Sequence, residues 1–219
     1  MYTLAEENYL KAIYHLSEGG LKNVSTNALA AELNTKPASV TDMVRRLSEK
    51  KMVSYEKYQG VNVSDDGRKY ALRIIRKHRL WETFLVEILG FGWDEVHNVA
   101  EQLEHIQSAT LIERLDKFLG YPEFDPHGEP IPDAMGNYNT HIRTLLADMS
   151  TGQHGRVAAV KVSDASFLRY LDKLKLQIGA EIEVTDEISF DQSKQLKVNQ
   201  QYSIYVSREV ARNIYCEVF

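Results

Sequence analysis

The chain has 219 residues, which exceeds the usual single domain of roughly 100 to 150 residues, so two small domains or one domain with an appendage are expected. Hydrophobic residues make up 43% and charged residues 26%, which excludes a disordered chain, a collagen and a disulfide-rich scaffold. The net charge of −5 does not by itself indicate nucleic-acid binding. One cysteine, the absence of a signal-peptide pattern and the lack of a long apolar run predict a cytoplasmic protein with no membrane partner.

The first quarter of the chain carries clear helix and turn signals. Thr3 and Glu6 fit a capping box, and Pro37 stands at the favoured first position of a later helix. Alternating residues on both sides of Gly60 indicate a β-hairpin. These signals predict helices over residues 5–17, 27–33 and 38–50, and a hairpin over residues 53–63.

This order of elements is typical of a winged helix-turn-helix, in which a tight turn leaves one face of the last helix free to enter a major groove. Small and hydroxylic side chains can approach base edges, while arginines can reach phosphates. The predicted DNA-binding residues are Lys36, Pro37, Ala38, Ser39, Thr41, Asp42, Arg45, Arg46 and, in the wing, Lys57. The alternatives are an ordinary three-helix domain with a solvated basic edge and a winged helix used for protein contacts.

The rest of the chain changes from helical to β-rich patterns. A long helix is expected from about residue 70 to 89, and a second, capped by Asp94, to about residue 119. Four prolines between residues 122 and 132 then indicate an extended linker. After residue 145 short strands are expected at 156–162, 181–184, 196–198 and 202–206, with one helix at 165–174. The predicted fold is therefore mainly α with a β-rich C-terminal domain.

The segment from Asp94 to Glu113 holds five acidic residues and two histidines but no lysine or arginine. Glu101, Glu104 and His105 fall at i,i+3 and i,i+4 spacing, where like charges repel unless a cation neutralises them. His97 lies one turn before Glu101, and His78 and Glu82 repeat the i,i+4 spacing on the preceding helix. Imidazole with carboxylate suits Mn, Fe, Zn, Co or Ni better than Ca or Mg. The alternative is an exposed acidic helix with structural histidines.

Enzyme signatures are not found: the sequence has no glycine-rich phosphate loop, nucleophile elbow or His-Glu-x-x-His helix, so no enzyme is expected. Three other classes compete with a metal-dependent regulator. They are a winged-helix regulator that responds to a small organic ligand without metal, a metallohydrolase, and a structural module for protein–protein contacts.

Several separated motifs, in the same order, resemble the diphtheria toxin repressor family of metal-dependent transcription factors, including its manganese-transport-regulator branch. They are ENYLKAIY at residues 7–14, KPASVTDMV at 36–44, RKHRL at 76–80, EQLEH at 101–105 and FDPHGEPIP at 124–132. Residues 145–219 resemble the family's SH3-like C-terminal domain, which is related to ferrous-transport accessory proteins. The resemblance covers essentially the whole chain.

The resemblance implies four parts and a homodimer that binds a palindromic operator on double-stranded DNA when divalent metal is present. The expected parts are a winged helix-turn-helix domain at residues 1–70, a helical metal-binding and dimerisation domain at 71–132, a linker at 133–145 and an SH3-like domain at 146–219. Metal would join the first helix to the segment that carries Glu104. Two recognition helices would then meet grooves about 34 Å apart, and genes for metal uptake would be repressed.

The resemblance also implies the metal ligands by position. A first site would use Glu101, Glu104 and His105 with Asn8, a second site His78, Glu82 and His97, and further candidates are Asp125, His127 and Asp164. Relatives have Met or Asp where Asn8 stands, and Lys11 replaces an extra carboxylate of some manganese-binding relatives. Because Glu101 stands where iron-selective relatives keep Cys, Mn²⁺ is the favoured co-repressor, with Fe²⁺ close behind. Zn²⁺, Co²⁺ and Ni²⁺ are expected to bind in vitro.

Overall fold

A computed structural model describes residues 2–56, 59–139 and 141–219. The chain forms two compact units. The first combines the chain up to His78 with residues 101–112 and 132–138, and the second combines residues 79–100, 113–131 and 139–219. No helix in the part of the chain that the structure describes is long and apolar enough to span a membrane.

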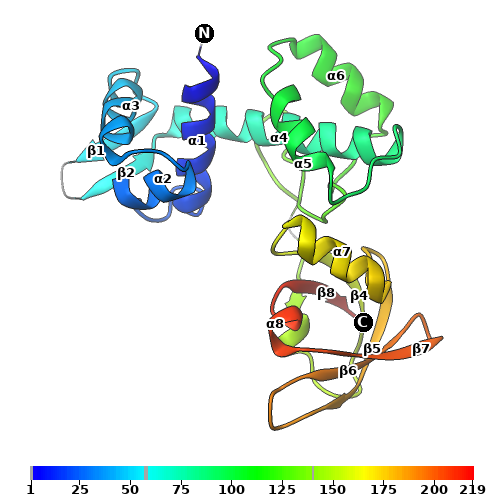
Figure 1. The fold of residues 1–219 in the computed structure, drawn as a ribbon. Helices are drawn as coiled ribbons and strands as arrows, with labels where there is room; N and C mark the ends of the chain where they lie inside the picture. The colour runs from blue at the N-terminus through cyan, green and yellow to red at the C-terminus, as the bar shows by residue number, and fades with distance from the viewer. Residues whose placement is uncertain (1, 57–58, 140) are drawn as a thin grey trace. The chain divides into compact units, whose positions relative to one another are not determined.

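The first unit contains the predicted winged helix-turn-helix, coloured blue to cyan in Figure 1. The elements are α1 (Leu4–Leu16), α2 (Thr26–Glu32), α3 (Pro37–Glu49), β1 (Val53–Glu56) and β2 (Gly60–Val63). The Thr3–Glu6 capping box is present at the start of α1, and β1 pairs with β2 in antiparallel register, Val53 opposite Val63. The three helices and the hairpin enclose one apolar core, in which Leu10, Val40 and Val61 are wholly buried.

Helix α4 (Asp65–Glu87) follows the wing without a break and is 23 residues long. The Oγ of Ser64 accepts a hydrogen bond from the amide of Gly67 at 3.0 Å, which satisfies a donor in the first turn. A Cβ at Gly67 would come within 1.9 Å of the Met52 carbonyl oxygen, so only glycine allows the helix to begin this close to the strand. The wing and the first turns of α4 are thereby joined tightly within the first unit.

The prediction of a single long helix between residues 94 and 119 is wrong. The chain forms α5 (Val96–Leu103) and α6 (Ala109–Phe118), with a non-helical segment between them. The Oγ of Ser108 accepts a hydrogen bond from the amide of Leu111 at 3.3 Å and so begins α6. The break releases the side chains of His105 and Gln107 from a helical path, and both reach Glu7 on α1. Contacts distant in sequence therefore override the local helical pattern.

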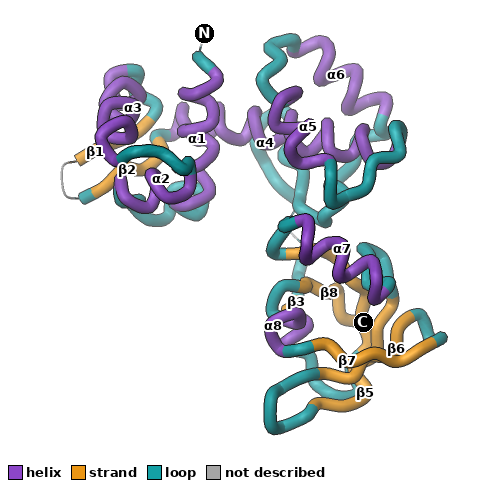
Figure 2. Tube along the Cα trace, viewed as in Figure 1, coloured by secondary structure: helices purple, strands orange, loops and turns teal. Residues whose placement is uncertain are grey.

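The second unit ends in a small β domain, whose strands are orange in Figure 2. Its elements are β3 (Thr144–Leu145), a 3-10 helix (Leu146–Asp148), β4 (His154–Val160), α7 (Ala165–Leu174), β5 (Glu181–Glu187), β6 (Lys194–Val198), β7 (Tyr202–Val206), α8 (Arg208–Ala211) and β8 (Ile214–Val218). The six strands form one antiparallel sheet in the order β3-β8-β4-β5-β6-β7. The predicted helix at 165–174 and strand at 202–206 are confirmed with their predicted bounds, and the other three predicted strands are confirmed with shifted ends. Strands β3 and β8 were not predicted. The predicted fold class is confirmed.

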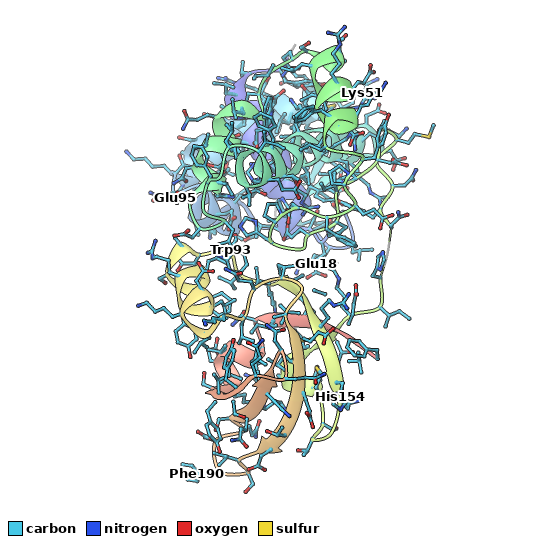
Figure 3. The ribbon with its side chains drawn as sticks, turned by 90° about the vertical axis from the view of Figure 1, so that its right-hand side faces the viewer. Glu18, Lys51, Trp93, Glu95, His154 and Phe190 are labelled. Atoms are coloured by element: carbon cyan, nitrogen blue, oxygen red, sulfur yellow. The ribbon has the colours of Figure 1, made fainter. Side chains whose placement is uncertain are left out.

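Residues 93 and 124–131 pack against this β domain within the second unit. Trp93, labelled in Figure 3, donates a hydrogen bond from Nε1 to Oδ2 of Asp172 on α7 at 3.0 Å. The amide of Val160 on β4 donates to the His127 carbonyl oxygen at 3.0 Å. Gly128 has a φ of 80°, and a Cβ there would lie 2.0 Å from the Ala158 carbonyl oxygen. The loop that carries His127 is thus held firmly along β4.

Candidate metal centres and DNA-binding face

Helix α3 presents the predicted DNA-binding side chains on its outer face. Val40, Val44 and Leu47 of this helix are wholly buried. The predicted residues Lys36, Pro37, Ala38, Ser39, Asp42, Arg45 and Arg46 are exposed, and Thr41 is half-buried. The Thr41 hydroxyl donates to the Pro37 carbonyl oxygen at 3.0 Å, so its methyl group and oxygen are held in one orientation. The exposed face therefore combines small polar residues with two arginines.

A hollow of about 470 Å³ lies beside this face. Its lining residues come from the start of α2, from α3 and from the wing, namely Asn23, Ser25, Thr26, Thr41, Arg45, Tyr55, Gln59 and Gly60. Apart from Arg45, these side chains are uncharged, as expected of a surface that meets base edges and sugars as well as phosphates. The predicted contact Lys57 lies outside the described residues.

The ammonium group of Lys11 lies among the first set of predicted ligands. We define the lysine cluster as Glu7, Lys11, His78, Glu101, Glu104 and His105, all in the first unit. The Lys11 ammonium lies 2.7 and 2.9 Å from the two oxygens of Glu104 and 3.6 Å from Oε1 of Glu101. The Nδ1 of His78 lies 2.5 Å from Oε2 of Glu104. Burial acts to raise the pKa of Glu104, but His78 and Lys11 outweigh it and hold this pKa below its ordinary value.

The carboxylate that α1 contributes to this cluster belongs to Glu7. Glu7 is buried and accepts hydrogen bonds from the Tyr70 hydroxyl at 2.6 Å and from the Gln107 amide at 2.8 Å. Its Oε2 lies 2.5 Å from Nδ1 of His105, whose Nε2 is 3.8 Å from Oε1 of Glu104. The predicted ligand Asn8 is exposed. The helical phase that Glu7 shares with the buried residues Leu10 and Tyr14 was the signal that could have identified it.

Glu82, from the second predicted site, lies beside three other predicted ligands. We define the histidine cluster as Glu82, His97, Asp125 and His127, all in the second unit. Oε1 of Glu82 lies 3.4 Å from Nδ1 of His97, and its Oε2 lies 3.7 Å from Nδ1 of His127. Glu82, Asp125 and His127 are buried, and each offers a ligand atom within 4.8 Å of the others. His78, which precedes Glu82 by one turn of α4, takes part in the lysine cluster.

Neighbouring backbone groups fix the orientation of the loop ligands. Nε2 of His127 lies 2.7 Å from the Trp93 carbonyl oxygen, so Nε2 carries the proton and Nδ1 faces Glu82. Oδ1 of Asp125 accepts from the amides of His127 at 2.8 Å and Glu129 at 2.9 Å. The Nε of Arg79 lies 3.6 Å from Oδ2 of Asp125. The loop thereby presents one imidazole nitrogen and one carboxylate oxygen towards Glu82.

Two members of the histidine cluster, Asp125 and His127, have pKa values raised well above their ordinary values. Burial first, and then the charges of Glu82 and Glu129, raise the pKa of Asp125 to about 7. Burial acts to lower the pKa of His127, but its contact with Glu82 and the negative charge of that residue raise it to about 9. The charge of Arg79 acts to lower the pKa of Asp125. Its guanidinium also contacts Glu129 and donates to the Pro130 carbonyl oxygen at 2.5 Å, so Asp125 receives only part of its charge. The cluster therefore favours the gain of positive charge.

Asp164 serves as the N-cap of α7 in this structure. Its Oδ1 accepts from the amides of Ser166 at 2.9 Å and Phe167 at 3.3 Å, and these bonds, with that from the Ser166 hydroxyl, lower its pKa. The groups of potential metal ligands found among the described residues do not include Asp164. They also do not include the set formed by Glu101, Glu104 and His105.

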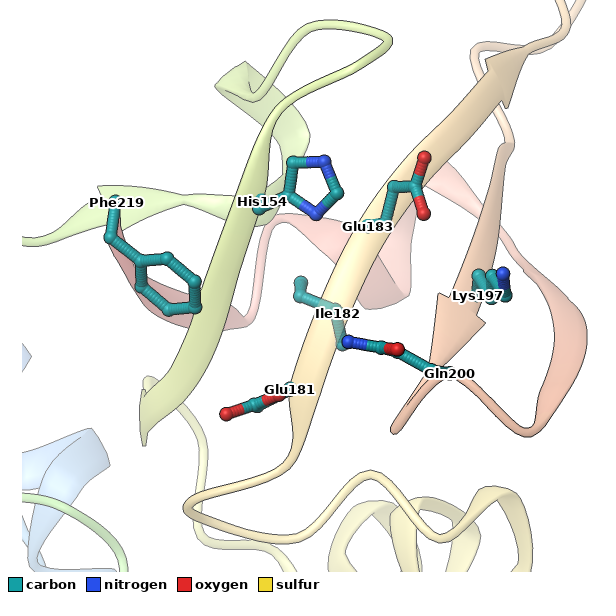
Figure 4. A pocket seen from close by; sticks show the side chains of 7 residues that line it. All are labelled: His154, Glu181, Ile182, Glu183, Lys197, Gln200 and Phe219. Carbon is teal, nitrogen blue, oxygen red and sulfur yellow. The ribbon is translucent and has the colours of Figure 1, made fainter.

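A shallow hollow of about 270 Å³ lies on the C-terminal sheet (Figure 4). Strand pairing places His154 opposite Glu183 and Glu183 opposite Lys197, on β4, β5 and β6. His154 and Lys197 are exposed and Glu183 is half-buried. Side chains of opposite charge that alternate across exposed strands are typical of a solvated sheet face.

Family models of known proteins match residues in both units of the chain. The family model described as the iron dependent repressor N-terminal DNA binding domain matches residues 1–61, and the repressor's metal binding and dimerisation domain matches residues 64–133. A FeoA domain matches residues 144–218. A solved structure titled as a manganese-dependent transcriptional repressor in complex with manganese is 33% identical, covers 98% of this chain and 100% of its own, and has a TM-score of 0.88. The chain belongs to the diphtheria toxin repressor family.

Other relatives include a transcriptional regulator, an iron-dependent repressor and a zinc-bound structure. The regulator MntR of Oceanobacillus iheyensis is 36% identical over 55% of this chain and 81% of its own length. The iron-dependent repressor IdeR of Mycobacterium tuberculosis is 34% identical over 58% of this chain, and the match spans about half of IdeR, 54%. A structure of ScaR with bound Zn²⁺ is 33% identical, covers 97% of this chain and 98% of its own, and has a TM-score of 0.76.

These comparisons confirm the main prediction, a metal-dependent transcriptional repressor, over a winged-helix regulator that responds to an organic ligand. The family is one of transcriptional regulators. The family resemblance found in the sequence motifs is confirmed, because the models of both the DNA-binding domain and the metal-binding domain match the chain.

Proposed function

We propose that this protein is a manganese-dependent repressor in which the histidine cluster holds the activating metal. The observation that carries the proposal is the pair of buried carboxylates, Glu82 and Asp125, with the Nδ1 of His127 directed towards them. Two buried carboxylates that face one another are costly without a neutralising cation. The fixed orientation of His127 by the Trp93 carbonyl is the arrangement that ligand histidines usually have.

The residues present fit a divalent transition metal. Glu82 and Asp125 offer oxygen, and His97 and His127 offer nitrogen, which is a donor set that suits Mn²⁺ and Fe²⁺. When bound, the metal would supply two positive charges where two carboxylates are buried. Solved structures titled as manganese-dependent transcriptional repressors, which cover 98% and 97% of this chain, favour Mn²⁺ over Fe²⁺.

Helix α4 connects this chemistry to DNA binding. Its first turns pack on the winged domain through Gly67, and Tyr70 on the same helix donates to Glu7 of α1. Glu82 lies about three turns after Tyr70 on the same helix. A ligand that fixes Glu82 therefore restrains the helix that supports the winged domain. Metal and DNA would then bind with reciprocal coupling of about 1–3 kcal/mol per chain.

The DNA-binding face would act in pairs. Two copies joined through their helical domains would present two α3 helices to successive major grooves of a palindromic operator. Ser39 and Thr41 would approach base edges, and Arg45 and Arg46 would contact phosphates. The proposed function involves no catalytic step. It places the protein in the cytoplasm, where it would repress genes for metal uptake when metal is abundant.

Fluorescence anisotropy on the protein's own upstream DNA tests the proposal at fixed salt, because DNA affinities depend strongly on ionic strength. Titrations with EDTA, Mn²⁺, anaerobic Fe²⁺ and Zn²⁺ should show tight binding with metal only. The His127→Ala variant should require at least about ten times more Mn²⁺, since loss of a ligand costs no less than loss of a residue behind it. His154→Ala, an exposed histidine, is the matched control. Tight binding in EDTA would contradict the proposal.

A further inference from the structure

Lys11 lies where the first predicted site would hold a metal. Its ammonium is within hydrogen-bond distance of both oxygens of Glu104, at 2.7 and 2.9 Å, and is 3.6 Å from Glu101. The Glu104 side chain is wholly buried, and that of Lys11 is 16% exposed. An ammonium in this position meets the two carboxylates that a metal ion would have to bridge. It also cannot itself be a metal ligand, because it has no free lone pair.

Other groups of the chain complete the neutralisation of Glu104. The His78 Nδ1 lies 2.5 Å from its second oxygen. Lys77, on the same turn of α4, donates to the Ile106 carbonyl oxygen at 3.5 Å and contributes a further positive charge near Glu7 and Glu104. Glu101 is exposed, and water screens its charge. Lys11, His78 and Lys77 therefore neutralise the buried negative charge of this cluster without any ion from solution.

The pair also links two distant segments of the chain. Lys11 belongs to α1, and Glu104 follows the end of α5, 93 residues later. Glu7, one turn before Lys11, reaches the same segment through His105 and Gln107. An ordinary surface ion pair, such as the exposed Lys22–Glu18 pair, makes no such connection. The two contacts of α1 thus fasten the winged domain to residues 101–112 within the first unit.

We propose that Lys11 is a tethered counterion that replaces a metal ion between Glu101 and Glu104, so that the lysine cluster joins α1 to residues 101–105 without metal. The inference rests on the proposed function, because it leaves the histidine cluster as the place where metal acts. Each chain therefore takes up one tightly bound Mn²⁺. Replacement of Lys11 by an uncharged or acidic side chain opens a second site at Glu101, Glu104 and His105.

The test is the number of Mn²⁺ ions bound per full-length chain, measured without DNA from the electron paramagnetic resonance signal of free Mn²⁺. The wild type should bind one ion and Lys11→Glu two. The double variant Lys11→Glu with Glu104→Gln should return to one, and Lys22→Glu is the control for a charge reversal elsewhere on the surface. Lys11→Met keeps the length of the side chain without its charge, and it should also gain a second, weaker ion.

Two results would overturn the inference. One is a wild type that binds two ions and loses one on Glu104→Gln. The other is a Lys11→Met protein with a native circular dichroism spectrum and unchanged binding. His127→Ala in the wild-type background separates this inference from the proposed function. If Lys11→Glu gains an ion while His127→Ala loses none, the inference stands and the assigned activating site fails; the opposite pair of results rejects the inference and leaves that site supported.

Discussion

The lysine cluster and the histidine cluster contain the same kinds of donor, and their carboxylates have opposite pKa shifts. Glu104 is 0% exposed and Asp125 is 6% exposed, so burial alone does not separate them. The pKa of Glu104 is lowered, because His78 and Lys11 outweigh its burial. Burial and the charge of Glu82 raise the pKa of Asp125 to about 7. Glu104 and Asp125 therefore differ in the charges beside them rather than in their burial.

The largest effect is expected from a change that removes a ligand of the histidine cluster. His127→Ala should lower metal-dependent DNA affinity by about 10- to 100-fold at a fixed, limiting Mn²⁺ concentration, because it deletes the nitrogen that faces Glu82. Anisotropy with His154→Ala as the control measures this. An unchanged affinity would mean that the histidine cluster does not hold the activating metal.

The pH dependence of metal binding sharpens the comparison. The pKa of Asp125 is raised from 3.8 to about 7 and that of His127 from 6.5 to about 9, so the folded chain holds protons that the unfolded chain has lost. The stability contributed by these groups without metal is therefore present at low pH. Asp125 loses its contribution between about pH 4 and pH 7, and His127 between about pH 6.5 and pH 9.

Because Mn²⁺ competes with these protons, the rise in melting temperature that it causes should be several degrees larger near pH 8 than near pH 6. Calorimetry at the two pH values with fixed free Mn²⁺ measures the difference. Asp125→Asn should reduce it, because the amide does not titrate. Equal shifts at the two pH values would contradict the assignment of Asp125 and His127 as ligands.

A change on the DNA-binding face should separate DNA affinity from metal binding. Arg45→Ala should weaken DNA binding about tenfold at saturating Mn²⁺ and lower the slope of log affinity against log salt by about 1, since it removes one phosphate contact. Mn²⁺ binding measured without DNA should not change. Arg212→Ala, an exposed arginine at the end of α8, provides the control. An unchanged salt slope would remove Arg45 from the interface.

The smallest effect is expected in the contact between Glu7 and His105. Glu7→Gln keeps the acceptor for the Tyr70 hydroxyl but removes the charge next to His105. The free energy of unfolding should fall by about 1 kcal/mol in urea titrations, whereas exposed Glu18→Gln should change it by less than about 0.5 kcal/mol. If the two variants behave alike, Glu7 does not help to hold α1 against residues 101–112.

Local signals were sufficient to predict the winged domain. The Thr3–Glu6 cap, Pro37 at the start of α3 and the turn at Gly60 each act over a few residues, and each has the predicted role. The break between α5 and α6 could not be predicted from local pattern, because contacts of His105 and Gln107 with α1 favour it. Helix propensity is weak in comparison with such tertiary contacts.

The candidate site was predicted in its residue types but not in its pairing. The sequence contains Lys11 and Glu104 but does not show that these side chains, 93 residues apart, form an ion pair in the folded chain. It also cannot show that Asp164 caps a helix, since a carboxylate before a helix and a carboxylate ligand look alike in sequence. The motifs placed Glu82 in a site with His78 and His97 and named Asp125 and His127 only as further candidates, whereas the fold brings Glu82, Asp125 and His127 together.

The most direct measurement of the central claim compares the Mn²⁺ concentration that half-activates DNA binding in Asp125→Asn and in Glu104→Gln, each with its fold verified. The contrast between the clusters predicts an increase of at least about tenfold for Asp125→Asn and less than about a twofold change for Glu104→Gln. A large increase for Glu104→Gln with little change for Asp125→Asn would contradict the account and would place the activating metal in the lysine cluster.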